Sequence, residues 1–74
     1  MKTTRLDQQW QQLMALCESE RSLREKGEHA RLLKHVASEI DHLATDMGFS
    51  ARLIATREFR AERVEGHIVR IVTE

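Results

Sequence analysis

The sequence predicts an α+β domain in which a two-helix antiparallel hairpin is followed by a C-terminal β-hairpin. Three observations lead to this prediction. The apolar residues of segment 33–47 recur with a helical period, which is typical of an amphipathic helix. Lys26-Gly27 provides a helix end shortly before that segment. Segment 67–73 is rich in β-branched residues, which favour a strand.

The chain of 74 residues is expected to form a single small domain over 1–74. A domain of this size buries only about 60% of the surface that its unfolded chain exposes, so we expect marginal stability. The core is also thin, because the only aromatic residues are Trp10, Phe49 and Phe59. Both features favour a protein that gains stability by forming a homodimer.

The charge balance limits the classes of partner. Twelve basic and twelve acidic residues give a formal net charge of zero, which argues against non-specific binding to nucleic acid or to membranes. The single cysteine, Cys17, cannot form an intramolecular disulfide, and no apolar run approaches the ~20 residues needed to cross a bilayer. We therefore expect a soluble cytoplasmic protein that has no membrane partner.

The first helix is predicted over residues 4–26. Thr3 or Thr4 can cap its first turn, and Asp7 places a negative charge near the positive end of the helix dipole. Its apolar stripe consists of Leu6, Trp10, Leu13 and Cys17. Beyond Cys17 this stripe turns polar at Glu20, so the far end of the helix is expected to be more exposed.

A second helix is predicted over residues 28–47 and should fold back antiparallel on the first, because the connection between them is short. Counting outward from the connection gives the expected contacts. The bulky Trp10 comes opposite the small Ala44, which is the alternation of size that close packing favours. The expected pairs are Leu23 with Leu32, Cys17 with Ala37, Leu13 with Ile40, and Trp10 with Ala44.

The β-hairpin is predicted to pair residues 51–64 with 67–73 through a turn at Glu65-Gly66. Alternation of apolar and polar residues fits the first segment better than a helical period does. In the expected register, Val69 and Ile71 face outward. The expected pairs are Arg57 with Glu74, Phe59 with Val72, Ala61 with Arg70, and Arg63 with Ile68.

No group of residues has the spacing of a catalytic site. Cys17 lies in an apolar stripe, where a thiol is usually inert. One row on the second helix has spacing that could hold a divalent metal, but it lies opposite the apolar stripe and is better explained as a solvated face with i,i+4 pairs. This row is His35, Glu39, His42 and Asp46. We expect no enzyme activity, catalytic residue, metal or cofactor.

These observations predict a small non-enzymatic regulatory or adaptor protein that acts through protein–protein interaction. Its expected partners are a second copy of itself, as a homodimer, and another protein. Exposed strand edges and outward apolar residues offer an interface. Arginine can form ion pairs on the surface or bind an acidic group through two hydrogen bonds. The predicted interface residues are Arg57, Arg60, Arg63, Val69 and Ile71.

A resemblance supports an alternative. Segment 43–54 resembles a helix-turn-helix motif of the phage-repressor type, with the small Ala44, a turn at Gly48, a capping Ser50 and the apolar Ile54. The resemblance implies an all-α fold with a short terminal strand, and a DNA-binding transcriptional regulator that uses residues 43–60. The side chains that would then face the major groove are Arg52, Ala55 and Thr56.

Overall fold

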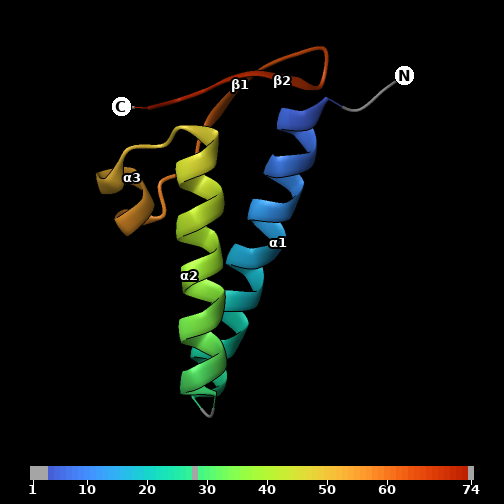
Figure 1. The fold of residues 1–74 in the computed structure, drawn as a ribbon. Coiled ribbons are helices and arrows are strands. Elements are labelled where there is room, and N and C mark those ends of the chain that lie inside the picture. The colour runs from blue at the N-terminus through green and yellow to red at the C-terminus, as the bar shows by residue number, and fades with distance from the viewer. Residues whose placement is uncertain (1–3, 28, 74) are drawn as a thin grey trace.

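The computed structural model describes residues 4–27 and 29–73. Its elements are, in chain order, α1 (Arg5–Lys26), α2 (Ala30–Met47), α3 (Ala51–Thr56), β1 (Ala61–Val64) and β2 (His67–Ile71). Helices α1 and α2 lie antiparallel, α3 lies beside the C-terminal end of α2, and the β-hairpin crosses that same end (Figure 1). The predicted α+β arrangement is confirmed. We call the end with α3 and the β-hairpin the head, and residues 15–26 with 30–39 the stem.

Local signals fix the ends of the two long helices. Thr4 caps α1 through a capping box, in which its hydroxyl oxygen accepts a hydrogen bond of 3.1 Å from the backbone N–H of Asp7. Gly27 and Gly48 end α1 and α2 in the left-handed conformation, with φ of 67° and 105°. The predicted cap at Thr3 and the predicted helix start at residue 28 lie outside the described residues.

The core lies where the head meets the two long helices. Leu13 of α1 and Ile40 of α2 are fully buried, and they belong to one apolar cluster. Aromatic rings extend this cluster, with Phe49 lying 4.9 Å from Phe59 between ring centroids. The buried apolar residues are Leu13, Val36, Ile40, Ala44, Phe49, Leu53, Ile54, Ile68 and Ile71.

Ala44 offers a test of this packing. Its side chain is fully buried in the cluster that includes Trp10 and Phe49. We expect Ala44→Leu to lower the free energy of unfolding by about 1–3 kcal/mol, because the added methylene groups have no space to occupy. Urea denaturation measures the change, and the same substitution at the exposed Ala55 serves as a control. An unchanged urea midpoint would show that Ala44 is not tightly packed.

The strand predicted over 51–64 is wrong in its first half, where Ala51–Thr56 form helix α3. Ser50 caps this helix, and its hydroxyl oxygen accepts a hydrogen bond of 3.4 Å from the backbone N–H of Leu53. Leu53 and the adjacent Ile54 are both buried in the same apolar cluster as residues of α1 and α2, whereas adjacent residues of a strand point to opposite faces. Burial of both residues on one side is compatible with a helix and not with the predicted half-buried strand.

The register of the β-hairpin also differs in part. The turn at Glu65-Gly66 and the pair of Arg63 with Ile68 are confirmed. The ladder then shifts by one residue at a β-bulge, so Val69 has no partner in β1. The observed pairs are Ala61 with Ile71, Glu62 with Arg70, Arg63 with Ile68, and Val64 with His67.

The bulge reverses the faces of the residues that follow it. Ile71, expected to face outward, turns into the core and is only 9% exposed, because an extra residue changes which side of the sheet the next side chain occupies. The backbone N–H of Val72 donates to the carbonyl of Arg60 at 2.9 Å, so Val72 does not pair with Phe59 as expected. The predicted partner of Arg57, Glu74, lies outside the described residues.

Candidate functional site

Asp7 joins the start of α1 to the β-hairpin. The backbone N–H of Ile68 donates to Asp7 Oδ1 at 2.9 Å, His67 Nδ1 lies 3.1 Å from Oδ2, and the Thr4 hydroxyl donates to Oδ2 at 2.8 Å. These contacts hold the pKa of the Asp7 carboxyl well below its ordinary value, the hydrogen bond from Ile68 having the largest effect. A helix-capping residue thus also positions strand β2.

Arg57 joins the segment after α3 to the stem. Its Nε and one terminal nitrogen donate to the two carboxylate oxygens of Glu20 at 3.0 and 2.9 Å, and the other terminal nitrogen donates to Asp41 at 3.2 Å and to the carbonyl of Ile54 at 2.7 Å. Hydrogen bonding to Arg57 lowers the pKa of Glu20, and the same bonds raise the pKa of Arg57. Because its guanidinium is engaged inside the chain, Arg57 is a poor candidate for the predicted interface.

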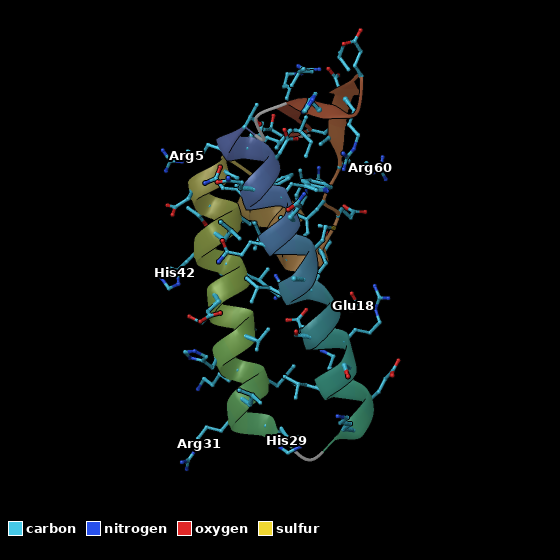
Figure 2. The ribbon with its side chains drawn as sticks, turned by 90° about the vertical axis from the view of Figure 1, so that its right-hand side faces the viewer. Arg5, Glu18, His29, Arg31, His42 and Arg60 are labelled. Carbon is cyan, nitrogen blue, oxygen red and sulfur yellow. The ribbon has the colours of Figure 1, made fainter. Side chains whose placement is uncertain are left out.

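The other predicted interface residues differ in their exposure to solvent. Val69 is 55% exposed, whereas Ile71 is buried and is removed from the interface. Arg60 and Arg63 are exposed, and the guanidinium of Arg63 lies 5.8 Å from the centroid of the Trp10 ring. Arg60 points away from the head in Figure 2. The sequence interpretation missed a further apolar residue on the β-hairpin, Val64, which is 57% exposed.

The residues of the DNA-binding alternative lie together on α3. Arg52, Ala55 and Thr56 are all exposed, and the buried Ala44 and Ile54 occupy the expected inner positions of the motif. The Thr56 hydroxyl is directed back to its own segment, with Thr56 Oγ1 lying 3.0 Å from the carbonyl oxygen of Arg52. The helix has six residues. The segment therefore consists of the end of α2, a turn at Gly48 and the short helix α3.

An apolar groove runs along the stem, on residues that were not assigned to an interface from the sequence. It has a volume of about 690 Å³ and is open to solvent. Leu32, which was expected to be covered by Leu23, is 49% exposed at the edge of this groove. The groove is lined by Ala15, Glu18, Ser19, Ser22 and Leu23 of α1 and by Leu32 and Val36 of α2. We call these residues the stem groove.

The row of possible metal ligands on α2 is engaged in local pairs. His35 Nε2 lies 3.1 Å from a carboxylate oxygen of Glu39, and His42 Nδ1 lies 2.9 Å from the carbonyl oxygen of Ser38. Within residues 4–27 and 29–73, no group of three or more His, Cys, Asp or Glu side chains is placed to hold a metal ion. Burial raises the pKa of the Cys17 thiol, which disfavours its reactive thiolate form.

The chain exposes more surface than a compact protein of its mass. It exposes 5588 Å², whereas a folded monomer of 8.6 kDa exposes about 4,700 Å². Its radius of gyration is 13.1 Å, whereas about 11 Å is typical of a domain of 74 residues. The stem projects from the head in Figure 1 and accounts for this elongated form.

Comparisons with protein-family models, with curated proteins and with solved structures found no match to this chain. In the described part of the chain, no helix combines the length and the apolar character that crossing a membrane requires. The chain's own surfaces are therefore the basis for assigning a function.

Proposed function

We propose that this chain is a small non-enzymatic regulatory or adaptor protein that acts through protein–protein contact as a homodimer. The observation that carries the proposal is the uncovered stem, where Leu32 stands exposed beside an apolar groove. A helix pair normally buries its apolar residues against another element, and the head covers only one end of this pair (Figure 1). A second protein surface would provide the missing cover.

The size of the excess surface supports self-association. The chain exposes about 900 Å² more than its mass predicts, and one partner in a standard protein–protein interface buries about 800 Å². A two-helix stem that pairs with a copy of itself forms a four-helix arrangement, a common solution for amphipathic helices. We place this dimer in the cytoplasm, where an unpaired cysteine such as Cys17 is expected.

The head offers a second surface, which we assign to a different protein. Val64 and Val69 are exposed on a two-stranded sheet whose outer edges are unpaired among the described strands. Such edges can accept an added strand from a partner. Arg60 and Arg63 are exposed on the same segment, beside the exposed Glu62 and Glu65, and we assign to these two arginines the binding of acidic residues of an extended partner.

Sedimentation equilibrium at micromolar concentrations tests the dimer. We expect the mass of two chains, with dissociation on dilution. A well-folded monomer at all concentrations would contradict the homodimer.

Peptide binding tests the head surface. A library of extended acidic peptides is screened for binding to the wild type and to Val69→Asp, with Ala55→Asp as the control substitution. Selected peptides that bind all three proteins equally would contradict the assignment of this surface.

DNA binding is the second candidate, because the decisive segment Ala51–Thr56 is a helix. If α3 enters a major groove, Arg52→Ala is expected to weaken specific binding by about tenfold, which corresponds to the loss of a good contact to a base. A mobility-shift assay with DNA selected from a random pool measures this, and Thr56→Ala tests the neighbouring position. Lys34→Ala removes the same charge from the stem and serves as the control. If the protein retains no DNA sequence from the pool, DNA binding is excluded.

A further inference from the structure

We infer that the stem pairs with a second copy of this chain about a twofold axis, so that Leu32 of each copy fills the stem groove of the other. This inference rests on the homodimer proposed above and specifies its interface. A twofold interface requires one surface that carries both a projection and the hollow that receives it. The stem has this property, because the exposed Leu32 lies at the edge of the groove.

The shape of the groove suits a leucine side chain. Its wall on α1 includes the small residues Ala15, Ser19 and Ser22, which leave room for an incoming side chain. Leu23 and Val36 supply apolar contacts. The exposed half of Leu32 would then be removed from water in both copies. The symmetric contact therefore buries two leucines, one from each copy. Together they form the apolar centre of the interface.

The charges around Leu32 are also self-complementary. On one side, Glu18 is the only charged residue among the described residues that line the stem groove. On the other side, the hollow next to Leu32 is lined by Arg31 together with His29 and His35, and His35 lies 3.1 Å from a carboxylate oxygen of Glu39, which leaves the positive charge of Arg31. A negative charge at Glu18 and a positive charge at Arg31 thus flank the same projecting leucine.

A twofold axis through the stem groove, between the levels of Arg31 and Glu18, brings these sides together. Figure 2 shows Arg31 on α2 and Glu18 on α1 pointing away from opposite sides of the stem. Rotation by half a turn exchanges the two sides, so Arg31 of one copy meets Glu18 of the other, and the reciprocal pair forms at the same time. Any pairing that placed the acidic sides together would be disfavoured by repulsion, so the charges also select the orientation.

Sedimentation velocity on the full chain tests the apolar contact. Leu32→Asp is expected to raise the Kd of the dimer by about a hundredfold or more, because each copy would place an unpaired carboxylate in the partner's apolar groove. Val69→Asp makes the same chemical change at a similarly exposed residue of the head, and the dimer should be unaffected. Circular dichroism is expected to be unchanged for both variants, since both side chains face solvent in the single chain.

Charge reversal tests the pairing and its symmetry. Glu18→Arg alone and Arg31→Glu alone should each raise the Kd by about tenfold, because both copies of the pair become repulsive. When the two single variants are mixed, a heterodimer should form with near wild-type Kd, since each Arg then faces a Glu. The double variant should likewise recover.

The outcomes separate this inference from the proposed function. A wild-type dimer whose Kd is unaffected by Leu32→Asp would overturn the stem pairing while leaving the homodimer intact. A double variant as weak as the two single effects combined would overturn the contact of Arg31 with Glu18. A wild type that stays monomeric at all concentrations would overturn both the pairing and the homodimer.

Discussion

Arg57→Ala is expected to lower the free energy of unfolding by about 3 kcal/mol, because it leaves the buried carboxylate of Glu20 without its partner. This lies at the lower end of the usual cost of breaking a buried ion pair, since the Arg57 side chain keeps some contact with solvent. A domain of this length has a total stability of only about 4–11 kcal/mol, so this loss is a large fraction of the whole. Urea denaturation followed by circular dichroism measures the loss.

Three matched variants define what Arg57 contributes. Arg57→Lys keeps the charge but cannot bind both oxygens of Glu20, so an intermediate loss is expected. Arg60→Ala removes an exposed arginine nearby and should change stability by less than about 0.5 kcal/mol. Combining Arg57→Met with Glu20→Leu should restore most of the stability, because no uncompensated charge remains. Equal losses for Arg57→Ala and Arg60→Ala would show that the ion pair is dispensable.

Asp7→Ala is expected to lower the melting temperature by roughly 10 °C, since it removes the side-chain half of the capping box and leaves the N–H of Ile68 buried without an acceptor. The loss of local stability should be greatest where the β-hairpin meets α1. Hydrogen exchange at the amide of Ile68 should therefore accelerate more than exchange at Leu13, which lies deeper in α1. Asp7→Asn retains an oxygen that can accept from Ile68, and a smaller loss is expected.

The pH dependence of the same residue gives an independent check. The pKa of Asp7 is lowered in the folded protein, so its contribution to stability is fully present above the unfolded value of 3.8 and is lost as the pH falls below it. The difference in melting temperature between wild type and Asp7→Asn should therefore shrink from about pH 5 toward about pH 2. Glu20, whose pKa is also lowered, leaves some acid sensitivity in the variant. A difference that stays constant with pH would contradict the role of the ionised carboxylate.

Much of the fold follows from signals that act over a few residues. The antiparallel α1 and α2, the capping Thr4, the terminal Gly48 and the turn at Glu65-Gly66 were all predicted, because caps, glycines and periodicity act on the adjacent backbone. The exposure of Val69 was also predicted from strand alternation. Of the candidate interface, Arg60, Arg63 and Val69 remain available, whereas Ile71 is buried and Arg57 is engaged.

The tertiary structure decided the features that depend on contacts between distant residues. Glu20 marked an exposed stretch when considered within its own helix, but it is buried by an arginine 37 positions away. Segment Ala51–Thr56 alternates like a strand, yet burial of Leu53 and Ile54 on the core makes it a helix, because packing outweighs weak local preferences. The bulge at Val69 likewise turns Ile71 inward to fill the core. Sequence patterns therefore determined where the helices and turns begin and end, whereas burial against distant residues determined which side chains remain on the surface.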